Sequence, residues 1–263
     1  MPDTSQSRGS VTVVGTGIRL VGQTTVEAVD CMRRADRLLY LVTDPATAAW
    51  LKQLNSSAET LDDLYAEGKS RLTTYKEMSN RIVTAALEGH RVCAAFYGHP
   101  GVFVNASHHA IRRARKLGLE ARMLPGISAE DCLFADLGVN PGDNGCQSFE
   151  ATDFLASRRR HDPTSELVLY QVGVLGEGSV RRGMAVRRDR LEVLTKFLRR
   201  HYPPHHRVVL YEAASFPGCE PRIIRVQLRT LANAPVRPMT TLYVPARPQR
   251  PSDERIMRWY DEP

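Results

Sequence analysis

Apolar positions in the first half of the chain fall into two alternating patterns. Short apolar runs typical of strands occur at residues 11–15 (VTVVG), 37–42 (RLLYLV) and 92–96 (VCAAF), and a fourth strand is expected at residues 119–126 (LEARMLPG), closed by Pro125-Gly126. Between them, apolar residues recur at helical spacing in residues 24–35, 74–89 and 105–118. This alternation of strand and helix predicts a mostly parallel α/β sheet.

The pattern becomes less regular after Pro125-Gly126. Further strand-like runs occur at residues 166–172, 207–213, 222–228 and 240–245, with turn-rich connections such as YPPHHR and FPGCEP. We therefore predict an α/β fold of two domains: an N-terminal α/β domain of residues 11–126 and a C-terminal mixed-sheet α/β domain of residues 127–245. Residues 1–10 are expected to be a disordered lead-in. Residues 246–263 form a Pro/Arg-rich tail, which could end in a short helix whose Ile256 and Trp259 dock on a partner.

Composition narrows the class of protein. Of the 263 residues, 42% are hydrophobic and 25% charged, as is usual for globular chains, and no run of 18 apolar residues suggests a membrane span. The polar N-terminus lacks the apolar centre of a signal peptide, and the five scattered cysteines include no CxxC pair. We expect free thiols and a cytoplasmic protein.

The net charge of +7 permits acidic partners. Much of the excess lies in the Arg158–Arg160 run, in residues 181–190 and in the tail, where we expect solvated faces and loops. Aromatic residues do not interleave with these basic runs as they do in proteins that bind single-stranded nucleic acid. We therefore expect neither nucleic acid nor membrane as a partner.

The loop after the first strand, GTGIRLVGQTT (residues 15–25), is rich in glycine. It departs from GxGxxG because Leu20 occupies the third glycine position, and from the P-loop because Gln23 stands where phosphate binding needs lysine. Both departures disfavour NAD and ATP. A plain glycine turn and a cofactor contact through bare backbone both stay open.

A second glycine-containing loop, FYGHPGVFV (residues 96–104), follows the third strand. Ligands of open α/β sheets gather at the carboxyl ends of the strands, so this loop is a candidate binding loop. His99 could act as a base, although a packing or hydrogen-bonding role is favoured. The histidines at 201, 205 and 206 are interrupted by Pro203-Pro204 and have no acidic or cysteine partners nearby, so we expect no metal site.

The segment YAEGKSRLTTY (residues 65–75) combines two phenols and a guanidinium. Arg71 and Tyr75 are four residues apart and so share one helix face, while Gly68 would let the chain turn so that Tyr65 folds back toward them. Taken alone, this pattern suits core packing and chemistry equally well.

Several motifs in this order resemble those of a known family. They are the first glycine loop, YGHPGVF (97–103), LPGISAEDCLFADLGVNPG (124–142), LVLYQVG (167–173), the run from VVLYEAASFPG (208–218) to residue 232, and TTLYVPA (240–246). Together they resemble the tetrapyrrole methylase superfamily, whose members use S-adenosylmethionine (SAM), bind it folded between two α/β domains and are typically homodimers.

One departure from that family is informative. The first loop of tetrapyrrole-type members usually reads GxGPGDxxLLT, whereas this chain lacks both the Pro and the Asp. The spacing Y-x5-R-x3-Y, together with YGHPGVF, instead resembles the borosin α-N-methyltransferases, which methylate backbone amides of ribosomally made peptides (RiPP biosynthesis). Because the sequence ends at Pro263 without a Val/Ile-rich core peptide, we expect the split type, a homodimer acting on two separate precursor chains.

The resemblance also assigns site residues. It implies catalytic roles for Tyr65, Arg71, Tyr75 and Tyr97: one phenol would remove the amide proton, Arg71 and the other phenol would stabilise the imidate oxygen, and Tyr97 would close the pocket. Which tyrosine is the base stays open. The implied cofactor contacts are Gly15, Gly17, Tyr97, His99, Val102, Phe103, Ser128, Ala129, Gln171, Tyr211, Ala213, Thr240 and Thr241.

Two other functions remain compatible with these residues. One is a tetrapyrrole, diphthine or ribosomal-RNA methyltransferase of the same fold. The other is a SAM-binding regulator or scaffold without enzymatic activity.

Overall fold

The computed structural model describes residues 9–179, 185–248 and 253–260. The chain forms two compact units. The first unit extends to Val139 and includes the later segments Gly176–Ala185 and Glu212–Arg222. The remaining residues form the second unit. The two-domain α/β class predicted from the sequence is thereby confirmed.

The first unit contains a five-stranded sheet in the order β3-β2-β4-β1-β5, with every described pairing parallel. Its elements are β1 (Ser10–Gly15), α1 (Val26–Arg34), β2 (Arg37–Leu41), α2 (Pro45–Leu54), β3 (Glu59–Thr60), the 3₁₀ turn η1 (Asp62–Leu64), α3 (Arg71–Leu87), β4 (Arg91–Phe96), α4 (Asn105–Lys116), β5 (Glu120–Met123) and α5 (Ala129–Leu137).

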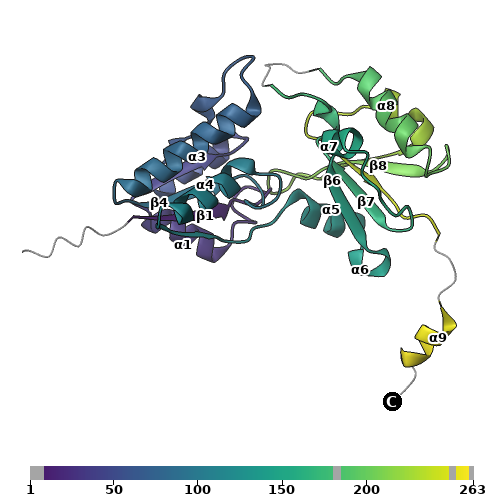
Figure 1. The fold of residues 1–263 in the computed structure, drawn as a ribbon, viewed down its shortest axis with the longest axis horizontal. Helices are drawn as coiled ribbons and strands as arrows, with labels where there is room; N and C mark the ends of the chain where they lie inside the picture. The colour runs from purple at the N-terminus through teal and green to yellow at the C-terminus, as the bar shows by residue number, and fades with distance from the viewer. Residues whose placement is uncertain (1–8, 180–184, 249–252, 261–263) are drawn as a thin grey trace, which may run out of the picture. The chain divides into compact units, whose positions relative to one another are not determined.

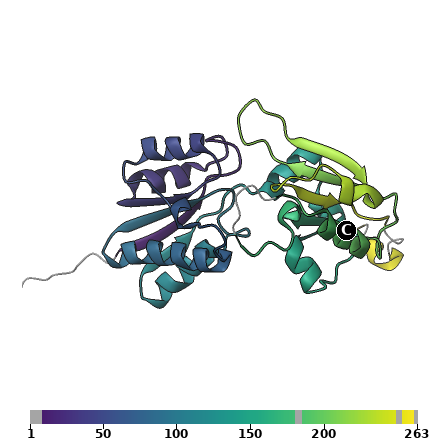
Figure 2. The ribbon, with the colours of Figure 1, turned by 90° about the horizontal axis from the view of Figure 1, so that it is seen from above.

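Helices cover both faces of this sheet (Figures 1 and 2). Val11, Val13 and Ala94 face a core shared with α3 and α4, whereas Val14 and Ala95 face a core shared with α1 and α2. This alternation follows from the two-residue period of a strand. It explains why the central strands are apolar on both faces.

The second unit contains a mixed sheet in the order β6-β7-β10-β8-β9, in which β6 and β7 are parallel and β10 is antiparallel to β7 and β8. Its elements are α6 (Pro141–Asn144), β6 (Cys146–Glu150), α7 (Ala151–Ala156), β7 (Glu166–Tyr170), the turn η2 (Val172–Val174), α8 (Arg188–Leu198), β8 (Arg207–Glu212), β9 (Arg222–Gln227), η3 (Leu228–Asn233), β10 (Thr241–Val244), α9 (Glu254–Met257) and η4 (Arg258–Tyr260). One face of this sheet packs on α7, α8 and η3 through Phe154, Leu194 and Leu231.

The ends of the predicted segments differ from the structure in several places. The first unit continues past residue 126, the predicted end of the N-terminal domain, because α5 belongs to it. Ser10, placed in the lead-in, begins β1, while residues 1–8 lie outside the described range. In the tail, Ile256 and Trp259 are exposed, and their docking on a partner stays a prediction; residues 249–252 and 261–263 lie outside the described range.

Helix α2 was not predicted from the periodicity. Its start is nevertheless marked in the sequence: Asp44 is the N-cap, accepting from the Thr47 N–H at 2.7 Å, and Pro45 occupies the first turn. Asp44-Pro45 follows the predicted strand of residues 37–42 and begins this helix. Within the described residues, no helix combines the length and apolar character needed to cross a membrane.

Candidate functional site

The carboxyl ends of β1 and β4 meet in two tightly packed glycine loops. Gly17 and Gly98 exchange backbone hydrogen bonds of 2.9 and 3.3 Å, and both have left-handed φ angles, of 69° and 73°. A Cβ at Gly15 would lie 2.2 Å from the carbonyl oxygen of Gly98. These glycines are therefore required by close backbone approach at the edge of the sheet where ligands of such folds bind.

Gln23 closes the first loop on itself. Its Oε1 accepts the backbone N–H groups of Ile18 at 3.0 Å and Arg19 at 2.8 Å. In a P-loop, such amides would be free to hold a phosphate. Here the Ile18 and Arg19 amides are already paired with Gln23, which supports the prediction against ATP binding.

Two histidines brace the loop after β4, His99 from the loop itself and His108 from α4. His99 Nδ1 accepts the Gly101 N–H at 2.9 Å, and His108 Nε2 lies 2.9 Å from the Gly101 carbonyl oxygen. His99 thus makes a hydrogen bond within its own loop, while its contact with a cofactor stays a prediction. Phe103 has a φ of 55° and a 44% exposed side chain, a strained position of a kind that clusters at functional sites.

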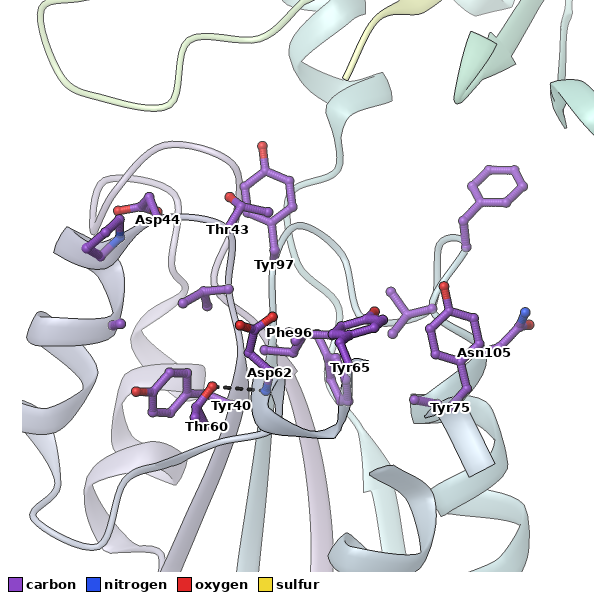
Figure 3. A pocket seen from close by; sticks show the side chains of 17 residues that line it. Tyr40, Thr43, Asp44, Thr60, Asp62, Tyr65, Tyr75, Phe96, Tyr97 and Asn105 are labelled. Atoms are coloured by element: carbon purple, nitrogen blue, oxygen red, sulfur yellow. Dashed lines mark hydrogen bonds between the residues drawn. The ribbon is translucent and has the colours of Figure 1, made fainter. Parts of the chain in front are cut away.

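The three predicted catalytic tyrosines line one cavity of about 620 Å³ in the first unit (Figure 3). Tyr65 follows η1, Tyr75 is on the second turn of α3, and Tyr97 follows β4. Aliphatic and aromatic side chains make up much of the remaining wall, and they include Tyr40, Leu41, Val42, Ala48, Phe96 and Phe103.

Arg71, the first residue of α3, lies in an adjoining cavity of about 810 Å³. Tyr65, Tyr75 and Asp62 line both cavities. Tyr65 and Tyr75 are thus shared by the cavity that Arg71 lines and the cavity that Tyr97 lines. The predicted turn between Tyr65 and Arg71 is present, with Gly68 at a φ of 72°.

The environment of Tyr65 favours the neutral phenol. Burial raises its pKa, and the neighbouring hydroxyl of Tyr75 raises it further by repulsion and by hydrogen bonding, while Arg71 acts in the opposite direction. Burial also raises the pKa of Tyr97, to about 12, although a hydrogen bond with Ser215 opposes the rise. Both phenols therefore keep their protons at neutral pH in the free chain.

Ser215 was missed by sequence reasoning. It lies in the segment Glu212–Arg222, which returns from β8 to the first unit, where its carbonyl oxygen accepts the Leu20 N–H at 2.9 Å and its side chain contacts Tyr97. The predicted cofactor residue Ala213 belongs to the same returning segment rather than to the second unit. No local sequence signal marks this return, because it depends on tertiary packing.

The other predicted cofactor residues fall into two groups. In the first unit, Val102 lies in the loop after β4, and Ser128 caps α5 in a reciprocal capping box with Asp131, followed by Ala129. In the second unit, Tyr211 pairs with Thr241 across β8 and β10, Thr240 precedes β10 and Gln171 follows β7. The pairing of Leu242 with Leu169 places Gln171 and Thr240 at that same end of the second sheet.

The first-unit residues suit a SAM-like group. Bare glycine backbone at the sheet edge permits close approach, and the aromatic faces of tyrosines attract cations such as a sulfonium. Among residues 9–179, 185–248 and 253–260, no three His, Cys, Asp or Glu side chains are grouped so as to hold a metal ion. That the protein uses no metal stays a prediction.

Comparisons with known proteins agree with this fold. The chain is 41% identical over 259 residues to "Methyltransferase/ribosomally synthesized cyclic peptide omphalotin A precursor ophMA" of Omphalotus olearius, covering 97% of this chain and 62% of that protein. It is 41% identical over 256 residues to "Methyltransferase/ribosomally synthesized type I borosin cyclic peptide precursor cmaMA" of Coprinopsis marcescibilis, covering 93% of this chain and 63% of the relative. The chain thus spans less than two thirds of the length of these relatives.

A solved structure supports the fold alone. The crystal structure of uroporphyrin-III-C-methyltransferase from Thermus thermophilus matches 90% of this chain and 92% of its own with a TM-score of 0.65, at 19% identity. The predicted resemblance to the borosin methyltransferases is confirmed by the relatives named above. Residues 10–232 match the model of the tetrapyrrole (corrin/porphyrin) methylases, and the chain belongs to that family.

Proposed function

We propose that this protein is a SAM-dependent methyltransferase that methylates backbone amide nitrogens of a ribosomally made peptide, repeatedly along its core. The observation that carries the proposal is the cluster of Tyr65, Tyr75 and Tyr97 around one cavity, with Arg71 beside the first two. The printed names of the relatives, which pair a methyltransferase with a peptide precursor, support the same substrate class.

A peptide nitrogen needs help to react because its lone pair is delocalised into the carbonyl group. The site must remove the N–H proton and stabilise negative charge on the amide oxygen. SAM would supply an electrophilic methyl group on a positively charged sulfur. The phenols and Arg71 would then remove the amide proton and stabilise the negative charge on the amide oxygen.

The environment of Tyr65 suggests how the roles are divided. A phenol held neutral by burial is suited to donate a hydrogen bond, either to the imidate oxygen or to a neighbouring phenolate. Tyr75 neighbours the Tyr65 hydroxyl and lies one helical turn after Arg71. We assign Tyr75 as the base that takes the amide proton, and Tyr65 and Arg71 as the groups that stabilise the resulting negative charge.

The predicted SAM contacts follow from the same proposal. In the first unit these are Gly15, Gly17, Tyr97, His99, Val102, Phe103, Ser128, Ala129 and Ala213; in the second they are Gln171, Tyr211, Thr240 and Thr241. Isothermal titration calorimetry with SAM, on the wild type and on Gly98→Val, tests whether the paired glycine loops that contain Gly15 and Gly17 take part in SAM binding. A side chain at Gly98 is strained at its positive φ and approaches Ile18, so SAM binding should weaken.

Mass spectrometry tests the reaction itself. The purified protein is incubated with SAM and a synthetic Val/Ile-rich peptide, and we expect product masses that increase in steps of one methylene group, with fragment ions placing each methyl on a backbone nitrogen. Methyl groups found only on side chains, or a peptide that binds and stays unmodified beside bound SAM, would contradict the proposal. A porphyrinogen added in place of the peptide should remain unmethylated.

The supply of the peptide and the assembly state remain separate predictions. The relatives are named as methyltransferase and precursor together, whereas the sequence predicted a separate precursor. Turnover of a peptide added in trans tests that prediction. Light scattering tests the predicted homodimer, and a cytoplasmic location also stays a prediction.

A further inference from the structure

The segment that carries Tyr65 is tied to α3 through a lysine. Lys69 Nζ forms an ion pair with Glu77 of α3 and also donates to the backbone carbonyl of Leu64 at 2.8 Å. The Lys69 side chain is 24% exposed, so the pair is partly withdrawn from solvent. One ammonium group thus joins the residue immediately before Tyr65 to the helix that carries Tyr75.

A second tie holds the beginning of the same segment. Arg81 of α3 pairs with Asp63 through two contacts of 2.8 Å each, in a bidentate geometry, and reaches the Thr60 carbonyl at 3.3 Å. Leu61 is fully buried beside it. The chain is therefore well anchored up to residue 63 by apolar packing and this pair together.

Leu64 and Tyr65 pack against the core of the first unit, but the three residues that follow supply no apolar anchor. Ala66, Glu67 and Gly68 are exposed, and a Cβ at Gly68 would meet no atom within 4 Å. Two backbone hydrogen bonds between residues three apart define the local turns: the Tyr65 N–H donates to the Asp62 carbonyl at 3.0 Å, and the Lys69 N–H donates to the Ala66 carbonyl at 3.1 Å. Exposed turns of this kind open easily unless a long-range contact closes them. In the described structure, Lys69 makes such a contact.

We propose that Lys69 is a positioning residue: its ion pair with Glu77 and its hydrogen bond to Leu64 hold Tyr65 against Tyr75 and so set the turnover rate. This inference rests on the proposed methyl transfer, for which the phenols must be aligned. Displacement of a catalytic group by about 1 Å can cost roughly 100-fold in rate. Lys69 contacts Leu64 and Glu77 and is not among the residues that line either cavity. Its loss should therefore affect turnover more than SAM binding.

The test compares Lys69→Met, which keeps the aliphatic stem and removes the charge, with Lys69→Arg, which restores a cation. We expect Lys69→Met to lower kcat by roughly 10- to 100-fold, which is the size of effect expected when a catalytic group such as Tyr65 is displaced by up to about 1 Å. The KM for SAM should stay within about twofold of the wild-type value. Lys69→Arg should recover most of the loss. Arg37→Met is the matched control, because it removes another ion pair between elements, Arg37 with Glu59 at 2.7 Å, and should leave kcat unchanged.

Hydrogen–deuterium exchange of the free protein supplies a readout that does not depend on activity. Lys69→Met should speed exchange of the backbone amides in residues 62–69, while Arg37→Met leaves them at the wild-type rate. Unchanged exchange in Lys69→Met would overturn the holding role. Faster exchange with unchanged kcat would overturn the link to turnover, as would a loss of kcat that Lys69→Arg does not recover.

The two proposals can fail separately. If wild-type protein transfers no methyl group to the peptide, the proposed function fails, and the dependence of turnover on Lys69 fails with it. Exchange in residues 62–69 then still decides whether Lys69 holds the segment that carries Tyr65.

Discussion

At the scale of single residues, the site depends on how phenols are held in different environments. Tyr65 and Tyr75 belong to the same cavity walls, yet they come from a turn and a helix. Burial stabilises the neutral form of Tyr65, so it would act as a donor. The spacing of Tyr65, Arg71 and Tyr75 in the sequence predicted that the three would meet. The proposed division of roles could not be read from the sequence, because burial depends on residues distant in sequence.

Removal of one hydroxyl should separate chemistry from cofactor binding. Tyr75→Phe is expected to lower turnover by roughly 100-fold or more, the size of effect usual for loss of a general base, with SAM affinity unchanged by calorimetry. Tyr202→Phe is the matched control, because the buried Tyr202 hydroxyl has no hydrogen-bond partner among the described residues. Wild-type turnover in Tyr75→Phe would contradict the base assignment.

The pH dependence of turnover tests the donor role of Tyr65. Because burial raises the pKa of this phenol above its usual value of about 10, it keeps its proton through mildly alkaline pH. The wild-type kcat should therefore show no falling limb between pH 7 and about 10. A fall within that range that disappears in Tyr65→Phe would show that Tyr65 loses its proton too early to serve as the donor.

At the scale of elements, the sequence predicted the α/β sheet of the first unit well, because the neighbouring strands β2, β4 and β1 are largely apolar and its helices amphipathic. Helix α2 was not predicted, although Asp44-Pro45 is a capping signal in the sequence. In the glycine loops, the sequence excluded nucleotide motifs but left open why each glycine is present. The answer lies in the close approach of β1 to the loop after β4, which is a tertiary contact.

Substitutions within the first loop should show that contact. Gly15→Ala would place a Cβ 2.2 Å from the Gly98 carbonyl oxygen, and the strand must shift, at a cost of roughly 1–3 kcal/mol or more in the free energy of unfolding. Gly22→Ala is the control in the same loop, since its Cβ would lie 3.8 Å from the nearest atom. Its effect should stay within about 0.5 kcal/mol. Urea unfolding measures both, and equal losses would contradict this account of Gly15.

At the scale of the whole molecule, the candidate site draws on segments from much of the chain. Ser215 reaches Tyr97 from a segment that follows β8, so the first unit is completed only after most of the second has been synthesised. Sequence motifs identified the family and the strand ends. They could not indicate this return, because the pattern of apolar residues does not record which unit a loop packs against.

Buried phenols in both units should also limit the stability of the molecule at high pH. Tyr243 is the clearest case: its hydroxyl donates to Glu166 Oε2 at 2.6 Å, and burial together with that carboxylate raises its pKa. A folded-state pKa above the unfolded value of about 10 contributes stability in full below pH 10, and this contribution is lost as pH rises from 10 through the folded value. The unfolding temperature should therefore be level from pH 8 to about 9.5 and fall above about pH 10.

Tyr243→Phe separates this contribution from other alkaline effects. At pH 8 the variant should be less stable by about 1–3 kcal/mol, because Glu166 loses a buried donor and, among the residues that the structure describes, keeps its contacts with Asn144 and the Ala246 N–H. Above pH 10 the wild type loses the same interaction by ionisation, so the difference between the two unfolding temperatures should shrink. Tyr202→Phe provides the comparison, since a phenol without a partner among the described residues should give little loss at pH 8. Parallel curves for wild type and Tyr243→Phe from pH 8 to 11 would show that the Tyr243–Glu166 hydrogen bond does not set the alkaline limit.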